Sequence, residues 1–600
     1  MQLRCLANKL GRQSFQRRHD LMHVVHGQHN AAVKNYCRVL EQTKHQHWRD
    51  WLEKGDDPDL WTAHRLTSSS GGNGGRMQIP ALTYKEGEED RTASTNQEKG
   101  RVLTRNFFPA KPCSDDSLAG YKYPKACSRA GKVTHDQIHK QLKKLKPLKA
   151  PGPDSIPNIV LTRCSDEIVD NPFYIYQAML ENSIMYKPWK EFITVVLRKP
   201  GKSSYNTPKA FRPIALLNTM WKVITTIVAN HITYCTEKYQ LLPANHFGGR
   251  PGHTTSDTIH MLTNRIKSAW RKREVVLVLF LDIEGAFPNA NPTRLVHNLR
   301  KQHLPEKYAN FMHNMLAERS TVLKFDSYIS VQMIIDNSIG QGDPLSMVLY
   351  QYYNMDLLDI PEHWDESTVA YVDDAFMLAT GKTFQIAHQR LRNLMEKQRG
   401  VVNWSTSHSS PLEYSKLMLI NFAPRHKKAD NPALTLAHRT IEPADSTKYL
   451  GVIVDKHLSW KAQQLYTIEK GTKWAAQIHQ LTRPTWGITP KHAKRLYISV
   501  ALLKILYALD IWCLPSDDPV IGPKANGSSK VTKQIASVQR AGALAITGGL
   551  RTSPIDTLDA CAHLLPAPLL IRKACHRAYV RMATLPPQHP LFKPVNWRTA

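Results

Sequence analysis

The chain has 600 residues, of which 42% are hydrophobic and 22% are charged, a globular composition. This length exceeds what one hydrophobic core supports, so we expect several compact units. Lysine and arginine number 80 against 50 acidic residues, and the resulting net charge of +30 favours a polyanionic partner. The apolar run at 275–281 is far shorter than the ~20 residues that cross a bilayer, which argues against a membrane-spanning protein.

Nine cysteines are scattered along the chain without any CxxC pair. This spacing favours free thiols in a reducing compartment over a disulfide framework. One group near the C-terminus could suggest a zinc site, but its spacing fits no common one. Its members are Cys561, His563, Cys575 and His576.

Residues 1–66 are predicted to form basic helices. The first nineteen residues lack acids, which is compatible with a mitochondrial presequence or with the start of a basic helix. Four apolar side chains could pack one small helical unit here: Trp48, Trp51, Leu52 and Trp61. The stretch "SSSGGNGG" at 68–75 predicts a flexible break, and 67–133 is expected to be a loosely structured linker.

A helix is predicted to begin at Thr134, where "THDQIHKQLKKL" opens with a capping-box pattern from Thr134 to Gln137. Ile138, Leu142 and Leu145 then share one helix face. The following "KPLKAPGPDSIPN" contains prolines and a glycine that end the helix and require an ordered turn.

From about 190 to 455, strands and helices are expected to alternate. "FITVVLRKP" and "VVLVLFLDI" predict strands, while "STVAYVDDAFMLAT" and "STKYLGVIVDKHLSW" predict hairpins. "FRPIALLNTMWKVITTIVANHITYC" and "NPTRLVHNLRK" predict helical stretches. Beyond 460 the pattern is helical to about 580, interrupted by a polar loop near "SDDPVIGPKANGSSK".

Two adjacent carboxylates, Asp373 and Asp374, interrupt the apolar hairpin at 367–380. A buried ionised carboxylate without a partner costs several kcal/mol. Protonation, pairing with Lys or Arg, or a bound cation would each make the pair tolerable. A tight turn that exposes both aspartates to water is the simpler structural explanation.

A second apolar segment has the same feature, because "VLVLFL" is followed at once by Asp282. A parallel-type buried strand that ends in a carboxylate would place this charge at the rim of the sheet. If this strand lies beside the 367–380 hairpin, Asp282, Asp373 and Asp374 converge. Mg²⁺ binds to one or two carboxylates together with substrate phosphates, and such a site would supply these ligands.

"FLDIEGAF", "GQGDPLSMVLY" and "AYVDDAF" occur in the order and separation of the palm motifs of reverse transcriptases. Upstream, "KPLKAPGPDSIPN", "LRKPGKSSYNTPKAFRPIALLNTMWKV" and "LLPANHFGGRPGHTTSD" resemble segments of non-LTR retrotransposon enzymes of the kind common in fungal genomes. "SKLMLINF" and "TKYLGVIVD" are similar to the palm lysine motif and the primer-grip hairpin. The resemblance implies that Asp282, Asp373 and Asp374 are the catalytic, metal-binding carboxylates.

The same resemblance assigns roles in nucleotide binding to five other residues. Phe287 matches an aromatic steric gate against a ribose 2′-hydroxyl, with Gly285 allowing the backbone to turn. Gln341 matches a position that contacts the incoming nucleotide. Arg212 matches an arginine that grips the triphosphate, and Lys199 could assist it. Lys416 matches a proposed proton donor to pyrophosphate. The plainer explanations are a core phenylalanine and solvated surface lysines.

The implied fold is α/β, a right-hand polymerase whose ferredoxin-like palm lies between fingers and a helical thumb. We expect five regions: a basic helical connector at 1–66, a linker at 67–133, fingers at 134–270, palm at 271–445, and a primer-grip hairpin with helical thumb at 446–600. No endonuclease or RNase H residue set is recognisable, so the chain resembles a fragment.

The implied reaction is RNA-directed DNA synthesis with two Mg²⁺ ions, or Mn²⁺ in their place. The expected partners are an RNA template, a DNA primer or target, and dNTPs, with no membrane, and the family's chromosomal target suggests the nucleus. A catalytically silent nucleic-acid-binding relic, or a maturase-like protein with the same fold, is the main alternative. An RNA-templated RNA polymerase is a third, disfavoured by the gate aromatic and the fingers motifs.

Overall fold

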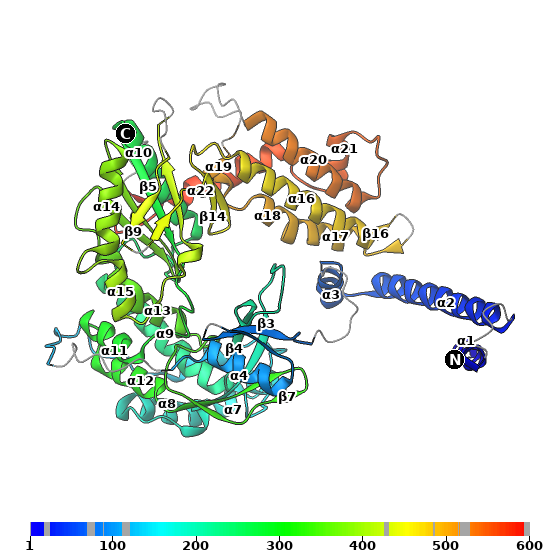
Figure 1. Ribbon diagram of the computed structural model, residues 1–600, viewed down its shortest axis with the longest axis horizontal. Helices are drawn as coiled ribbons and strands as arrows, with labels where there is room; N and C mark the ends of the chain where they lie inside the picture. The colour runs from blue at the N-terminus through cyan, green and yellow to red at the C-terminus, as the bar shows by residue number, and fades with distance from the viewer. Residues whose placement is uncertain are drawn as a thin grey trace. The chain divides into compact units, whose positions relative to one another are not determined.

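The computed structural model describes residues 2–16, 24–68, 78–87, 89–110, 120–424, 431–437, 439–483, 486–513, 515 and 528–592 (Figure 1). The chain forms two compact units. One contains Met1–Asn73 and Lys461–Val580, and the other contains Gly74–Trp460 and Arg581–Ala600. Each unit therefore combines two segments that are separated in the sequence. The expected break at 68–75 and most of the polar loop near 515–530 lie outside the described residues.

The first unit is almost entirely helical, as the pattern predicts for 1–66 and for the region beyond 460. Its N-terminal helices are α1 Gln2–Gln16, α2 Val24–Lys54 and α3 Asp57–Ser68. Its C-terminal elements are α16 Lys461–Leu481, β16 Thr482–Arg483, β17 Trp486–Gly487, α17 Pro490–Leu496, η6 Tyr497–Leu502, α18 Leu503–Ile505, α19 Leu509–Trp512, α20 Ser528–Thr547, α21 Ile555–Cys561 and α22 Ala567–Ala583, which ends in the second unit.

The N-terminal helices do not pack as a separate small unit. Leu52 and Leu60 are buried in one core together with Leu481 and other side chains of the C-terminal helices. Trp48 and Trp51 pack beside this core, with ring centroids 5.1 Å apart. Trp61, by contrast, keeps 41% of its surface exposed. Segments about 400 residues apart in sequence therefore form one core.

The second unit mixes helices and strands. Up to residue 271 its elements are β1 Leu82–Glu86, β2 Glu89–Ala93, α4 Asn96–Phe107, α5 His135–Lys143, α6 Asn158–Arg163, α7 Ser165–Ile168, α8 Asp170–Asn182, η2 Lys187–Lys190, β3 Glu191–Arg198, η3 Pro208–Ala210, β4 Phe211–Leu216, α9 Thr219–Tyr239 and α10 Thr255–Arg271. The later elements are β5 Val275–Leu281, α11 Pro292–Lys301, α12 Glu306–Leu316, β6 Arg319–Phe325, β7 Tyr328–Ile329, β8 Met333–Ile335, α13 Ser346–Asn354, η4 Met355–Asp359, β9 Glu366–Tyr371, β10 Asp374–Gly381, α14 Phe384–Glu396, α15 Val401–Ser407, η5 Tyr414–Lys416, β11 Met418–Phe422, β12 Leu434–Leu436, β13 Arg439–Ile441, β14 Ser446–Tyr449 and β15 Val452–Asp455.

The central sheet has the strand order β11-β5-β10-β9, and every neighbouring pair is antiparallel. The expectation of a parallel-type strand at 275–281 is therefore wrong. All seven residues of β5 are buried because both faces of the strand are covered. On one face Leu279 shares a core with Leu391 of α14. On the other face Phe280 packs against Tyr449 of the β14–β15 hairpin, with ring centroids 5.0 Å apart.

A second sheet has the order β4-β3-β6-β7, with β8 also paired to β6. β3 runs antiparallel to β4 and parallel to β6. The prediction of a continuous helix from "FRPI" onward is thus wrong in its first part, since 211–216 is strand β4 and helix α9 begins at Thr219. Pro213 interrupts a helix but is tolerated on this edge strand.

The capping box predicted at Thr134 is present and begins α5. Thr134 Oγ1 accepts from the Gln137 amide, and Gln137 Oε1 accepts from the Thr134 amide. Ile138 and Leu142 are buried, as their spacing predicts. The following turn packs closely, because a Cβ on Gly152 would lie 2.4 Å from Asn218 Oδ1.

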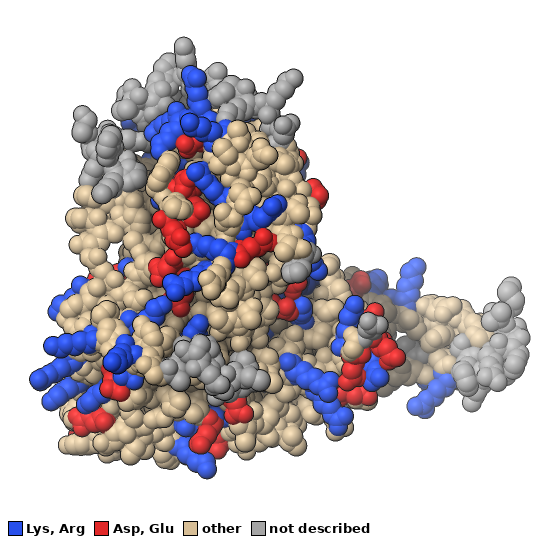
Figure 2. Space-filling view, turned by 60° about the vertical axis from the view of Figure 1, so that its left-hand side comes forward, with Lys and Arg blue, Asp and Glu red and all other residues tan. Residues whose placement is uncertain are grey.

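The positively charged side chains do not form one continuous patch on the face shown in Figure 2. Lysine and arginine side chains are spread over this face, with aspartate and glutamate side chains between them. None of the helices that the structure describes is long and apolar enough to span a membrane.

Candidate active site

The three aspartates are brought together at one end of the central sheet. β5 and β10 are antiparallel with Leu281 opposite Ala375, so Asp282 follows one strand where Asp374 begins the other. A two-residue turn, Val372 and Asp373, joins β9 to β10. Residues almost 100 positions apart therefore converge through strand pairing.

The turn holds Val372 in the left-handed region, with φ of 59°. A β-branched side chain rarely adopts this conformation, and a strained residue of this kind is often found at a functional site. The next residue, Asp373, lies at the tip of the turn. Its side chain and that of Asp374 are exposed, as the simpler explanation of the carboxylate pair predicts.

The carboxylates influence one another strongly. Desolvation by the surrounding protein and the charges of Asp373 and Asp282 raise the pKa of Asp374 to about 6. Desolvation and the charge of Asp282 also raise the pKa of Asp373, while Arg212 opposes this change. These shifts indicate a concentration of negative charge that a cation would relieve.

Asp282 is half-exposed and forms an ion pair with Lys416, whose Nζ lies 2.8 Å from Oδ2. No group of three or more His, Cys, Asp or Glu side chains within the described part of the chain is arranged to hold a metal ion by itself. The oxygen donors and the raised carboxylate pKa values nevertheless fit a divalent ion such as Mg²⁺, which takes part of its ligands from substrate phosphates and water.

Lys416 reaches Asp282 because its loop pairs with the segment after β5. The Glu413 amide donates to the Asp282 carbonyl (2.9 Å), and the Glu284 amide donates to the Pro411 carbonyl (2.9 Å). These hydrogen bonds align the loop before Lys416 alongside the segment that follows β5. The lysine is therefore placed by backbone contacts as well as by its own charge.

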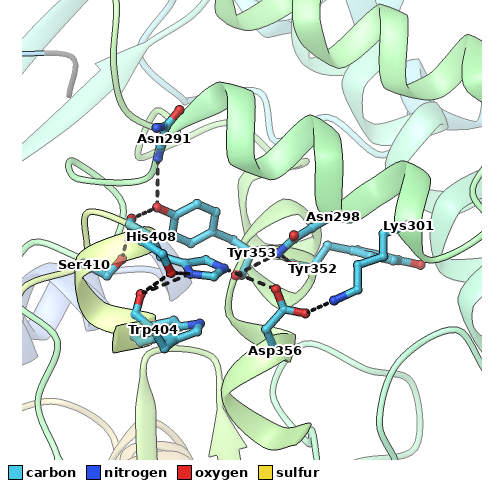
Figure 3. Close-up of polar contacts among 10 residues, drawn as sticks. Asn291, Asn298, Lys301, Tyr352, Tyr353, Asp356, Trp404, His408 and Ser410 are labelled. Atoms are coloured by element: carbon cyan, nitrogen blue, oxygen red, sulfur yellow. Dashed lines mark hydrogen bonds and ion pairs between the residues drawn. The ribbon is translucent and has the colours of Figure 1, made fainter. Parts of the chain in front are cut away.

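A buried polar network fixes the start of this loop (Figure 3). The Tyr353 hydroxyl accepts from the Asn291 amide (3.0 Å) and donates to the His408 carbonyl. Ser410 also donates to the His408 carbonyl (3.2 Å). Tyr353 thus joins the segment after Phe287 to the segment that leads to Lys416.

The same network contains a charged group. Asp356 lies 2.8 Å from Lys301 Nζ and 3.3 Å from His408 Nε2. Burial alone would raise the pKa of Asp356, but hydrogen bonds from His408 and Lys301 outweigh it and hold the pKa well below its ordinary range. The carboxylate is therefore ionised and stabilises the loop at neutral pH.

The β3–β4 segment brings cations to the aspartates. Arg212 pairs across the hairpin with Leu197 and interacts with Asp373. Burial, followed by the charges of Arg212, Lys202 and Lys416, lowers the pKa of Lys199. This gathering of positive charge next to carboxylates suits a polyanionic ligand such as a triphosphate.

Phe287 lies on the turn that follows Asp282. Gly285 has φ of 55° and allows the chain to reverse. The Phe287 ring stacks on the buried ring of Tyr350, with centroids 5.0 Å apart and an angle of 25° between the planes. The Tyr350 hydroxyl has no hydrogen-bond partner among the described residues. Burial and the charge of Asp373 raise the Tyr350 pKa.

Gln341 belongs to a segment that connects the Phe287 turn to β4. The Ile339 amide donates to the Phe287 carbonyl (2.9 Å), and the Ala215 amide donates to the Gln341 carbonyl (2.9 Å). Gly342 is required beside it, because a Cβ there would lie 2.8 Å from the Ala215 carbonyl oxygen. The backbone of Gln341 is thus held against the strand that carries Arg212.

Sequence reasoning missed two lysines, Lys202 and Lys209, and Tyr350, on which Phe287 stacks. Lys209, in η3 just before β4, lies 2.6 Å from Glu284 and 3.1 Å from Glu413, and so joins this turn to the segment after β5 and to the Lys416 loop. Lys202 and Tyr350 lie within the segments that resemble reverse transcriptases. The chain has 80 lysines and arginines, and nothing in the local sequence distinguishes a lysine near the carboxylates from the others. Their positions follow only from folding.

Comparison with known proteins agrees with this geometry. Residues 197–454 match the family model described as reverse transcriptase (RNA-dependent DNA polymerase). The chain is 23% identical over 508 residues to the probable RNA-directed DNA polymerase from transposon BS of Drosophila melanogaster, which covers 80% of this chain and 54% of that protein. It is 25% identical over 385 residues to the RNA-directed DNA polymerase from mobile element jockey of the same fly, covering 63% of this chain and 40% of that protein.

A third relative is the Pol polyprotein from the type-1 retrotransposable element R1 of Bradysia coprophila, with 20% identity over 480 residues, 80% of this chain and 46% of that protein. The chain spans about half the length of the curated relatives it matches. These relatives come from insects, so they lend no support to the expected fungal type. They support the expected non-LTR retrotransposon family.

Proposed function

Residues 197–454 of this chain form a domain of the reverse transcriptase family, similar to those of non-LTR retrotransposons, and from this premise we propose that the chain is an RNA-directed DNA polymerase. The reaction would be attack of a primer 3′-hydroxyl on the α-phosphate of a dNTP, with loss of pyrophosphate. RNA template and DNA primer would be its partners, and the nucleus its place of action. The convergence of Asp282 with Asp373 and Asp374 carries the proposal.

Asp282 and Asp373 would hold two Mg²⁺ ions, with Asp374 beside them. When bound, such ions activate the attacking oxygen and neutralise charge on the leaving group. The half-exposed carboxylate of Asp282 and the raised pKa values of the other two support this assignment. In the absence of metal, Lys416 neutralises part of the same charge.

The other side chains would bind and orient the nucleotide. Arg212 and Lys199 are suited to hold the triphosphate, because both lie beside the carboxylates that would share its metal ions. Phe287, supported by Tyr350, would contact the sugar and exclude a 2′-hydroxyl. Gln341 would contact the nucleotide from the segment beside β4. Lys416 would donate a proton to pyrophosphate as it leaves.

This assignment also gives the two sheets and the helical unit their roles. The sheet β11-β5-β10-β9 with its helices would be the palm, and the β4-β3-β6 sheet would belong to the fingers. The β14–β15 hairpin would grip the primer, and the helices of the first unit after residue 460 would act as the thumb. The helices at 1–66 would be a connector.

A primer-extension assay tests the function. The purified chain with poly(rA)/oligo(dT), dTTP and Mg²⁺ should extend the primer. Asp373→Asn should reduce extension to background, because the amide is a weaker metal ligand. Asp90→Asn is a matched control, because Asp90 is an exposed aspartate on β2 of the separate β1–β2 sheet, and this variant should retain full activity.

Equal incorporation by the wild type and Asp373→Asn would refute the catalytic assignment. A wild type that binds the primer–template in the presence of Mg²⁺ but never extends it would instead support the silent nucleic-acid-binding alternative. The two outcomes are separated by measuring binding and extension on the same preparation.

A further inference from the structure

The turn that carries Asp373 needs support, because Val372 holds a left-handed backbone conformation that a β-branched residue disfavours. Strain of this kind persists only where neighbouring contacts impose it. The contacts around Val372 therefore identify the residues that determine where Asp373 points.

Asn354, the last residue of α13, makes the direct contact. Its side chain is fully buried, and Nδ2 donates to the Val372 carbonyl at 2.5 Å. A carbonyl only accepts, so the amide nitrogen must face Val372. The remaining atom, Oδ1, lies 3.0 Å from His246 Nε2 and must accept from it.

His246 is fixed in one protonation state by its surroundings. Burial lowers the pKa of His246 to about 4, so the ring is neutral at neutral pH. A neutral imidazole donates from one nitrogen, and the bond to Asn354 places that hydrogen on Nε2. Nδ1 finds no hydrogen-bond partner among the described residues. Among the described residues, the hydrogen bond to Asn354 is therefore the one that the ring makes.

The backbone next to His246 lies against the same turn. The Phe247 amide donates to the Ala370 carbonyl on β9 (2.9 Å). Gly248 packs directly on the turn, since a Cβ there would lie 2.4 Å from the Val372 amide nitrogen. Gln351 Nε2 donates to the Gly248 carbonyl at 2.5 Å and holds this segment to α13.

We propose that His246 and Asn354 are positioning residues for Asp373: the chain His246–Asn354–Val372 fixes the turn so that Asp373 is presented toward Asp282. Neither side chain touches the substrate; both act through the Val372 carbonyl. This inference rests on the proposed function, because it assigns Asp373 a metal ion to hold.

The test replaces Asn354 by leucine, which preserves the approximate volume and removes the donor to Val372. We expect turnover to fall about 10- to 100-fold, since displacement of a reacting group by about 1 Å has effects of this size. Half-maximal activation should need about tenfold more Mg²⁺, while the KM for dTTP changes by less than about twofold. Binding of Mn²⁺ to the chain without nucleotide, followed by electron paramagnetic resonance, should weaken in parallel.

Asn421→Leu is the matched control. Asn421 is also a buried asparagine of the central sheet whose amide donates to a backbone carbonyl, that of Pro432 (2.9 Å). It pairs with Leu277, toward the start of β5 and away from the turn. The two variants should lose comparable thermal stability, but Asn421→Leu should keep the wild-type Mg²⁺ and Mn²⁺ dependence.

Two variants at His246 provide a second measurement that does not depend on the folding of Asn354→Leu. His246→Gln keeps an N–H donor for Asn354 Oδ1, and His246→Leu does not. We expect glutamine to restore most of the Mn²⁺ affinity that leucine loses. Equal Mn²⁺ affinity in all folded variants, or equal loss in Asn421→Leu, overturns the proposal. Failure of the proposed function would instead appear as a wild type without extension.

Discussion

Three neighbouring carboxylates repel one another, and single residues around them reduce the cost of this repulsion. Asp282 is paired with Lys416 at 2.8 Å, so part of the negative charge is neutralised within the chain. Asp374, with a pKa raised to about 6, takes up a proton more readily than an ordinary aspartate. Pairing with Lys416 therefore lowers the cost of this charge, and the raised pKa of Asp374 reflects the negative charge that remains for a bound cation to neutralise.

Phe287 is the residue through which sugar selectivity can be tested. Its ring is held by stacking on the buried Tyr350, whose pKa is raised by burial and by the charge of Asp373. Phe287→Ala should raise incorporation of ribonucleotides relative to deoxyribonucleotides by at least about tenfold, because the space for a 2′-hydroxyl is opened. Primer extension with paired rNTP and dNTP substrates measures this ratio.

Phe173→Ala provides the comparison for that experiment. Phe173 is also partly buried, but it stacks on His135 at the α5–α8 contact, with ring centroids 3.8 Å apart. This variant should leave the ratio unchanged. Unaltered sugar selectivity in Phe287→Ala would show that Phe287 is an ordinary core residue.

Among the elements, β5 shows how burial can mislead a prediction of topology. A continuous apolar run is typical of parallel strands, because helices cover both faces of a parallel sheet. Here the sheet is antiparallel, and the second face is covered by Tyr449 of the β14–β15 hairpin. The pattern correctly indicated a strand buried on both sides, but it contained no information about the covering element.

The loop that carries Lys416 is held by contacts of the partly buried Asp356, which predicts a pH-dependent stability. The folded-state pKa of Asp356 is lowered, so its contribution is present above the ordinary carboxyl pKa and is lost as pH falls through the folded value. Asp356→Asn should lower the free energy of unfolding by about 1–3 kcal/mol at neutral pH. The difference from wild type should shrink below about pH 4. Urea unfolding of both proteins, from neutral pH to below about pH 4, measures this difference in the free energy of unfolding.

Asp359→Asn is the control on the same turn of helix. Burial and the charge of Asp356 raise the pKa of Asp359, so its ionised form destabilises the folded state above the ordinary pKa. Its replacement by a neutral amide should therefore leave stability unchanged or increase it at neutral pH. Equal destabilisation by both substitutions would contradict the assignment of Asp356.

For the molecule as a whole, the net charge of +30 predicts that nucleic-acid affinity depends strongly on salt concentration. Affinity for a labelled primer–template should fall by about 10³-fold or more between about 50 and 200 mM salt, if six or more phosphates are contacted. The reason is the release of condensed counterions on binding. Fluorescence anisotropy over a salt series measures the slope, and a slope near zero would show that the basic residues do not contact the backbone.

Much of this protein could be inferred from local patterns. The capping box at Thr134, the strands at 191–198 and 275–281, and the hairpin at 367–380 follow from periodicity and from residue types with a direct physical effect on the backbone. The three aspartates were also recognisable, because a carboxylate next to a buried apolar strand is costly without a purpose. These features depend on interactions within a few residues.

Only the tertiary structure determined which distant groups meet. The register of β5 with β10 places Asp282 beside Asp374, and the fold brings His246 and Asn354 to Val372 and Lys209 to Glu413. In the local sequence, nothing distinguishes His246, Asn354 or Lys209 from other residues of the same type. Hydrogen bonds and ion pairs act over a few ångströms in space, whatever the separation along the chain, and so these contacts arise only once the chain has folded.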